Sequence, residues 1–312
     1  MNYYTLLFVK AFLSFIISAL ICKSLIVLLN RKKLYVANKP ELLVQKERKA
    51  KTPGFGGISF VVCSIIFTVI GSTEFDSYFY ILIIAILGFG FEGFIDDIMK
   101  LKTSNGDGVT VKQKILTEFL LSSLIAFLII ETKGEKTNVL YFVFSVFYIF
   151  YFVNAVNITD GLDGLSTGTV LPVFILLLFL ISQVFKLESQ LFNFTLNLIF
   201  ALFGFLIYNH KPAKIFMGDL GSQALGGAIA TISLMLGKEI VILIAGMVLL
   251  LEFISSLIQI ICIRFFNTKV FKIAPVHHLL EFYGVSETKI VSLWFVLSSF
   301  FSICAYLIVR FL

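Results

Sequence analysis

Residues 241–251 read VILIAGMVLLL, and this run decides the fold class of the chain. A membrane-spanning β-strand would alternate apolar and polar residues over about ten positions. Residues 241–251 do not alternate, and apolar residues continue on both sides of the run. A predominantly apolar segment of about 20 residues is typical of a membrane-spanning α-helix. The run therefore predicts an all-α membrane protein.

The composition extends this prediction to the whole chain. Hydrophobic residues make up 59% of the 312 residues, and charged residues make up only 14%. A soluble domain would contain roughly 25% charged residues. Long apolar runs recur from end to end, so we expect one integral membrane domain over residues 1–312, with no soluble domain of consequence.

The net charge of +6 does not indicate a nucleic-acid partner. Nucleic-acid binding needs a basic surface on a domain that faces water, and the sequence offers no such domain. Multi-span proteins place Lys and Arg in cytoplasmic loops, which accounts for the excess. We therefore expect a lipid bilayer, and no nucleic acid, as the surroundings of this chain.

The apolar runs predict a polytopic protein with ten transmembrane helices, which places both termini on the same side of the membrane. The expected spans are residues 4–29, 54–71, 78–95, 114–131, 139–156, 166–185, 190–208, 220–236, 239–263 and 290–311.

The loops differ in charge from one side of these spans to the other. The loops on one side of the spans, together with the helix ends that border them, hold 18 of the 25 Lys and Arg residues. This set comprises residues 30–53, 96–113, 157–165, 209–219 and 264–289. The positive-inside rule makes it cytoplasmic, so both termini are expected on the extracytoplasmic side of the cell membrane. Five aspartates then fall at the cytoplasmic face, where the active site is expected: Asp96, Asp97, Asp160, Asp163 and Asp219.

Asp96 and Asp97 stand side by side in GFIDDIMK, residues 93–100. Adjacent carboxylates repel each other, so the pair indicates a bound divalent cation or a residue that acts as a base. Two acids near the C-terminus of a helix also oppose the helix dipole, which argues against a purely structural role. The alternative is a pair of helix-end charges that face water.

The sharpest motif is NAVNITDGLDGLSTG, residues 154–168. Asn154, Asn157, Asp160 and Asp163 recur every three residues, which places them on one drifting helical face or in a tight turn. The glycines between them permit close approach of a ligand to the backbone. An EF-hand loop would need a terminal Glu that is missing here.

The stretch YNHKPAKIFMGDLGSQALGG, residues 208–227, places Asp219 before a helix of small residues. A carboxylate beside such a helix start can hold Mg²⁺ while backbone N–H groups meet phosphate oxygens. Asp219 could instead be a helix N-cap.

Two further segments carry polar chemistry. His277 and His278 lie in APVHHLLEFYGVSETK, residues 274–289. Adjacent histidines fit phosphate contact or proton handling better than metal binding. The alternative is that they are ordinary surface or core residues. KERKAKTPGFGG, residues 46–57, offers lysines to phosphates, or serves only as an orientation signal followed by helix packing.

Together these motifs indicate metal-assisted phosphoryl transfer at the membrane surface. A transporter is the first competing class, and its ionisable residues near the bilayer centre would be Glu92 and Glu252. A non-catalytic scaffold is the second, and it would have no need for five converging acids.

The same motifs, in this order, resemble the polyprenyl-phosphate N-acetylhexosamine-1-phosphate transferases over roughly residues 48–295. Residues 51–57, 106–114, 224–228 and 274–291 are most similar to the phospho-N-acetylmuramoyl-pentapeptide transferase (MraY) family. That resemblance implies ten spans, Mg²⁺ dependence and, in many members, a homodimer. It implies transfer of phospho-N-acetylmuramoyl-pentapeptide from a UDP-linked amino sugar donor to undecaprenyl phosphate, which yields lipid I and UMP for peptidoglycan synthesis.

The resemblance also implies roles for individual residues. Asp96 and Asp97 match the paired acids near the lipid phosphate, and Asp219 matches the Mg²⁺ ligand. The remaining matches concern the donor: Asn157, Asp160 and Asp163 at the nucleotide sugar, Asn209 and Phe216 near the nucleoside, and Lys49 (or Lys51), Lys100 and Lys112 around the pyrophosphate.

Two positions depart from the family pattern. Leu279 stands where a third consecutive histidine is usual, and Gly54-Phe55 replaces the usual Thr-Met. Both departures leave the acids untouched and bear on the sugar, because specificity is a difference between affinities. A related transferase that moves GlcNAc-1-phosphate or another HexNAc-1-phosphate, as in teichoic acid or O-antigen initiation, is the alternative.

Overall fold

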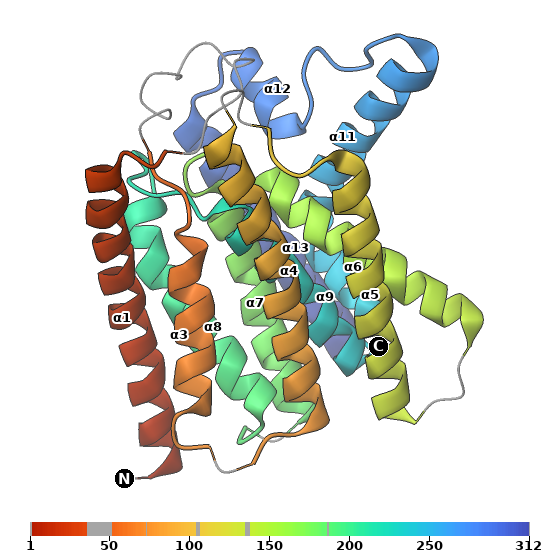
Figure 1. The fold of residues 1–312 in the computed structure, drawn as a ribbon. Coiled ribbons are helices and arrows are strands. Elements are labelled where there is room, and N and C mark those ends of the chain that lie inside the picture. Colours follow the sequence, from red (N-terminus) through yellow and green to blue (C-terminus); the bar gives the residue numbers. More distant parts are fainter. Residues whose placement is uncertain are drawn as a thin grey trace.

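A computed structural model describes residues 2–35, 52–72, 74–103, 107–134, 138–185 and 187–311. Within these ranges the chain forms twelve helices and no strand, so the all-α prediction is confirmed. Figure 1 shows them as one bundle. The helices are α1 (Tyr3–Lys32), α3 (Gly57–Val69), α4 (Ser77–Lys102), α5 (Val111–Lys133), α6 (Val139–Thr159), α7 (Leu165–Val184), α8 (Gln190–Asn209), α9 (Gly218–Leu236), α10 (Glu239–Ala245), α11 (Met247–Phe266), α12 (Val276–Phe282) and α13 (Glu287–Phe311).

Eight of the described helices are long and apolar enough to cross a membrane: α1, α4, α5, α6, α7, α8, α11 and α13. The protein is therefore a multi-pass membrane protein. The predicted spans 54–71 and 220–236 correspond to α3 and α9. Helix α3 has only 13 residues, since residues 52–55 before it are not helical and Phe55 has a left-handed φ of 67°. Helix α9 is rich in Gly, Ser and Ala.

The predicted single span 239–263 was wrong in one respect, because the structure divides it into α10 and α11 at Gly246. Gly246 has φ −84° and ψ 18°, away from the α-helical values near −63° and −42°. Glycine has the lowest helix propensity of the non-proline residues, so the helix breaks at this position. An added Cβ there would also lie 3.2 Å from the Phe152 ring of α6.

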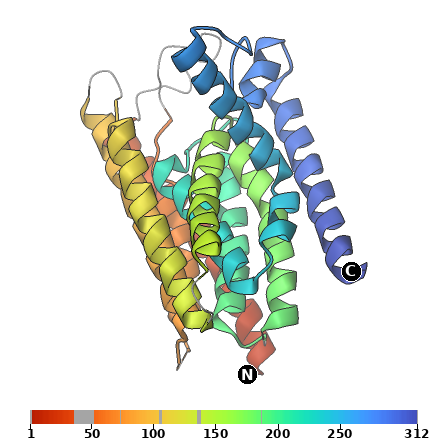
Figure 2. The same ribbon diagram turned by 90° about the vertical axis from the view of Figure 1, so that its right-hand side faces the viewer.

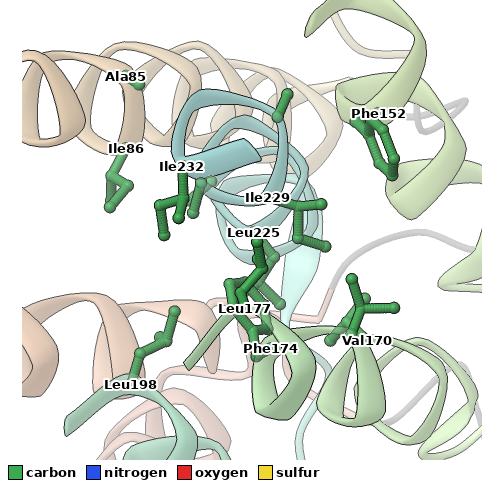
Figure 3. Close-up of a cluster of buried hydrophobic side chains, with 14 of the residues drawn as sticks. Ala85, Ile86, Phe152, Val170, Phe174, Leu177, Leu198, Leu225, Ile229 and Ile232 are labelled. Carbon is green, nitrogen blue, oxygen red and sulfur yellow. The ribbon is translucent and has the colours of Figure 1, made fainter. Parts of the chain in front are cut away.

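Helix α9 is the centre of the bundle, although it is less apolar than its neighbours. Every residue from Leu220 to Leu236 is buried. Figure 3 shows Leu225, Ile229 and Ile232 of α9 among apolar side chains of the surrounding helices, including Ile86 of α4 and Phe174 of α7. A helix enclosed by protein does not need an apolar outer face, which explains its composition.

Glycines bring α9 close to the backbones of two neighbours. A Cβ at Gly93 of α4 would overlap the backbone of Asp219, and one at Gly226 of α9 would lie 2.6 Å from Cα of Val153 in α6. Contacts this short exist only because a side chain is missing. They fix the start of α9 against α4, and its middle against α6.

The polar segments gather at one end of the bundle. Helices α4, α6 and α8 end there, and α5, α7 and α9 begin there, below α12 at the top of Figure 1. The chain starts at the opposite end, and α13 runs from α12 back toward it (Figure 2). The loops that carry the predicted site residues therefore share one end of the molecule.

The Gly226→Ala variant tests the packing of α9. Its methyl group would overlap the Phe152 carbonyl oxygen, so we expect a loss of about 1–3 kcal/mol from overpacking. Gly168→Ala is the matched control, because its new Cβ would meet only Phe295 at 3.9 Å. Thermal unfolding in detergent measures both variants, and equal midpoints would contradict the close α6–α9 contact.

Candidate active site

Asp97 holds the first turn of α9. Its Oδ1 accepts a hydrogen bond from the backbone N–H of Asp219 (3.1 Å), and its Oδ2 accepts one from Leu220 (3.2 Å). The first N–H groups of a helix have no partner within it, and a carboxylate satisfies two of them here. Asp219 is therefore not the cap of its own helix; Asp97, from α4, has that role.

Asp219 is thereby placed beside two lysines and Asp96. Its Oδ2 lies 3.1 Å from Nζ of Lys100 and 3.0 Å from Nζ of Lys114. Lys100 also pairs with Oδ2 of Asp96 at 2.7 Å, and Oδ1 of Asp96 accepts the Val109 N–H at 2.6 Å. Helices α4, α5 and α9 therefore each contribute a charged group to one cluster.

Helix α6 adds amide side chains. Nζ of Lys114 donates to Oδ1 of Asn157 (3.4 Å), and Nδ2 of Asn157 donates to the hydroxyl of Ser222 in α9 (2.9 Å). One helical turn earlier, Asn154 donates to buried Glu118 of α5 at 2.7 Å. Both asparagines of the predicted motif therefore face the acids, as their three-residue spacing indicated.

We call this group the acidic cluster. It consists of Glu92, Asp96, Asp97, Lys100, Lys114, Glu118, Asn154, Asn157 and Asp219.

The donors of the acidic cluster fit a divalent cation that is completed by substrate phosphates. Five carboxyl groups stand against two ammonium groups, and Glu92 and Glu118 each keep one buried oxygen without a hydrogen-bond partner among the described residues. The described part of the chain contains no group of three or more His, Cys, Asp or Glu side chains placed to hold a metal by themselves. Mg²⁺ usually takes only one or two carboxylates, with waters and phosphates completing its shell. Asp219 and Asp96 offer such a pair.

A second group lies around the histidines, and we call it the histidine cluster. It consists of Asp163, Lys211, Glu252, His277, His278, Glu281, Glu287 and Trp294. Asp163 accepts the Ala213 N–H (2.9 Å) and donates its own N–H to Glu287 (2.8 Å), which pairs with Lys211 at 2.8 Å.

The loop after α6 joins the two clusters. Asp160 is the C-cap of α6, and a Cβ at Gly161 would overlap Nε2 of His277 and lie 3.1 Å from Nε2 of His278. The predicted repeat of four polar residues is thus divided, with Asn154 and Asn157 at the acidic cluster and Asp163 at the histidine cluster.

Asn209 and Phe216 frame the segment between α8 and α9. Buried Asn209 donates to the Ile215 carbonyl (3.0 Å) and accepts from Thr167 (3.2 Å). The N–H of Phe216 donates to Pro53 (2.9 Å), and its carbonyl accepts from Gly56 (2.8 Å). The start of α3 is therefore attached to the segment that leads into Asp219.

The structure brings most of the predicted residues together, with two exceptions. Lys112 is exposed, and its place at the pyrophosphate stays a prediction. Lys49 lies outside the described residues, as does Lys51. The sequence argument assigned no role to Lys114 or Glu118, although their i, i+4 spacing places both on one helix face.

Comparison with known proteins defines the class to which this fold and site belong. The family model for glycosyl transferase family 4 matches residues 79–237, from the first residues of α4 to the end of α9. The chain belongs to this family.

Its relatives are more specific. It is 35% identical over 308 residues to the phospho-N-acetylmuramoyl-pentapeptide-transferase of Staphylococcus carnosus (strain TM300), covering 93% of this chain and 95% of that protein. It is 35% identical over 306 residues to the enzyme of the same name from Staphylococcus aureus (strain Newman), with the same coverage. The resemblance predicted from the motifs is thereby confirmed.

The Asp97→Asn variant tests the anchor of α9. Asp97 receives the Asp219 and Leu220 N–H groups on separate oxygens, and in asparagine one of these oxygens becomes an NH₂ group that faces an N–H donor. Loss of a hydrogen bond to a charged group contributes about 1.5–3 kcal/mol, and we expect a lower thermal midpoint in detergent.

Asp76→Asn is the matched control, because exposed Asp76 receives only the Phe79 N–H at the start of α4. Asn caps helices as well as Asp does, so this variant should stay near the wild-type midpoint. A midpoint for Asp97→Asn as high as that of the control would show that Asp97 does not anchor α9.

Proposed function

We propose that this protein transfers phospho-N-acetylmuramoyl-pentapeptide from its UDP-linked donor to undecaprenyl phosphate, forming lipid I and UMP. The observation that carries the proposal is the placement of Asp219 beside Asp96, Lys100 and Lys114 at the loop-rich end of a membrane bundle. The names of the relatives, at 35% identity over almost the whole chain, support the donor group.

The reaction is a displacement at phosphorus. An oxygen of the lipid phosphate attacks the donor phosphorus that carries the sugar, and the bond from this phosphorus to the UMP oxygen breaks. Asp96 orients or deprotonates the lipid phosphate. Asp97 supports the site by holding α9 and, with it, Asp219. A lipid phosphate is already a competent nucleophile, so one displacement suffices and no covalent aspartyl intermediate is needed.

Charge balance explains the lysines. Donor and acceptor both bring phosphate charges to a cluster rich in carboxylates, and this repulsion must be offset. Lys100 and Lys114 supply two positive charges at Asp219, and Lys112, in the first turn of α5, and Lys49 would add others. Asp219 would hold Mg²⁺, and the ion would supply positive charge near the pyrophosphate.

The donor extends from the acidic cluster toward the histidine cluster. Asn154, Asn157, Asp160 and Asp163 line its path along residues 154–163, with Asn209 and Phe216 at the nucleoside. His277 and His278 contact a phosphate or the sugar, and their position against Gly161 supports this assignment.

The membrane topology belongs to the same proposal. Helices α3 and α9 and the broken pair α10–α11 complete ten spans in one transferase domain over residues 1–312. Both termini would then lie on the extracytoplasmic side and the two clusters would face the cytoplasm, because the last turns of α1, α4 and α11 carry basic residues at this end of the bundle (Figure 1). The protein is further proposed to act as a homodimer.

Transfer of a smaller HexNAc-1-phosphate is the alternative. It is favoured by Leu279, which follows His278 in α12 where the family pattern has a third histidine. This change lies in the histidine cluster region, where the sugar is expected.

A donor panel decides between the two reactions. We expect UMP release with UDP-N-acetylmuramoyl-pentapeptide and undecaprenyl phosphate, and at most trace release with UDP-GlcNAc. EDTA should abolish UMP release, and added Mg²⁺ should restore it. Asp219→Asn serves as the inactive blank. Glu188→Gln serves as the active control, because Glu188 is exposed at the end of the bundle opposite the two clusters. Reaction of the small sugars alone would refute the pentapeptide donor and leave the superfamily assignment.

The lysine pair Lys112 and Lys114 offers a matched test of the site. Lys114→Gln removes the charge that pairs with Asp219. A hydrogen bond to a charged group contributes about 1.5–3 kcal/mol, and about 1.36 kcal/mol corresponds to a tenfold change in rate. We therefore expect kcat/KM to fall about tenfold or more. Lys112→Gln should lose less than Lys114→Gln, because the charge of exposed Lys112 is screened by solvent at the edge of the site. The reverse order in UMP-release kinetics would place the pyrophosphate at Lys112.

A further inference from the structure

The acid Glu252 is used by neither the acidic cluster nor the proposed chemistry, yet it is fully buried in α11. Its Oε1 accepts hydrogen bonds from the Trp294 indole N–H at 2.6 Å and from the His277 backbone N–H at 3.2 Å. Its Oε2 lies 3.0 Å from Nδ1 of His277. Three helices, α11, α12 and α13, therefore meet at one carboxylate.

The other ring nitrogen of His277 faces the loop after α6. His277 has no exposed surface, and its Nε2 has no hydrogen-bond partner within the described part of the chain. A Cβ at Gly161 would overlap this atom. The ring thus connects a fixed carboxylate on one side with the loop of the proposed donor site on the other.

The hydrogen bonds determine which nitrogen carries a proton. Both oxygens of Glu252 face N–H donors, Oε1 that of Trp294 and Oε2 the His277 backbone at 3.5 Å, so Nδ1 of His277 is placed to donate to the same carboxylate. A second partner of this kind commonly selects the tautomer and orientation of a functional histidine. Nε2 is then the atom presented to Gly161.

We propose that Glu252 is a positioning residue: its carboxylate holds His277 with Nδ1 protonated and aims Nε2 at the Gly161 loop, where the nucleotide sugar binds. The location of the sugar rests on the proposed function, whereas the ring state does not. Trp294 ties the same carboxylate to α13 and so fixes it against α11. The seven-residue α12 is too short to fix the ring by itself.

Histidine nitrogen NMR tests the ring state without any substrate. The full-length chain, labelled with ¹⁵N-histidine, contains only three histidines, and His277→Gln identifies the signals of His277. We expect Nδ1 to be protonated in the wild type. In Glu252→Gln the amide oxygen must serve Trp294 and the His277 N–H, so the amide NH₂ faces Nδ1 and the ring proton moves to Nε2. An unprotonated Nδ1 in the wild type, or an unchanged pattern in Glu252→Gln, would overturn the proposal.

Kinetics test the consequence. We expect Glu252→Gln to lower kcat for UMP release about 10- to 100-fold, the range typical of lost orienting partners. Glu239→Gln is the matched control, because it makes the same acid-to-amide change at a carboxylate of α10 that accepts the Tyr141 hydroxyl at 2.6 Å and belongs to neither cluster; it should stay within about threefold. Equal losses in both variants would indicate a structural role only. A chain without transferase activity would refute the proposed function, and the NMR result would still decide the ring state.

Gly161→Ala reaches the same ring from the opposite side. Its own kcat tests the proposal when Glu252→Gln does not fold, and the double variant adds a second test when it does. Gly161 has no positive φ, so alanine acts only through its methyl group against Nε2. We expect a similar loss in kcat, and a double variant with Glu252→Gln that falls no further than the worse single variant, since both displace one ring. Wild-type kcat in Gly161→Ala, or additive losses, would separate the loop from His277 and refute the proposal.

Discussion

The two hydrogen bonds from α9 to the Asp97 carboxylate set the geometry on which the acidic cluster depends. They join the polar end of α4 to the first turn of α9, and the absence of a side chain at Gly93 lets the two backbones touch at this level. The register between the helices is thereby fixed within a fraction of a turn. Asp96 and Asp219 then reach the same lysine, although they are far apart in sequence. A carboxylate that sequence reasoning assigned to chemistry acts first as the support of another carboxylate.

Burial explains why so many charges converge. A carboxylate removed from water needs a cation or several N–H donors, and inside a membrane bundle those must come from other helices. Lys100 and Lys114 serve Asp219, backbone N–H groups serve Asp97, and Asn154 serves Glu118. Each acid therefore fixes a neighbouring helix as well as its own charge. The acidic cluster still has more carboxylates than lysines, and a bound cation would offset this remaining negative charge. The packing of the bundle therefore favours the metal-assisted chemistry that we propose.

Much of this arrangement could be predicted from sequence. Apolar runs predicted the helices, and three-residue spacing predicted that Asn154 and Asn157 share a helical face or a tight turn; only the structure shows that this face meets the acids. The division of span 239–263 at Gly246 was not predicted, because hydropathy does not register a change of backbone angle within an apolar run. The difference between Lys112 and Lys114 also escaped, since two residues on a helix are separated by about 200° and only the packing shows which one faces inward. Glu252 was noticed as an ionisable residue in an apolar span, but its partners come from segments whose contact no pattern of spacing encodes.

The two clusters differ in what they are able to recognise. Under the proposed function, the acidic cluster deals with phosphates and a cation, groups shared by every donor of this superfamily, so its residues have little freedom to change. The histidine cluster lies where donors differ, beyond the Gly161 loop, and α11, α12 and α13 hold its Glu252, His277 and Trp294 part. The departure at Leu279 falls in this second region and leaves every acid in place. Because α11, α12 and α13 contribute no residue to the acidic cluster, the sugar recognised can vary while the geometry of phosphoryl transfer is retained.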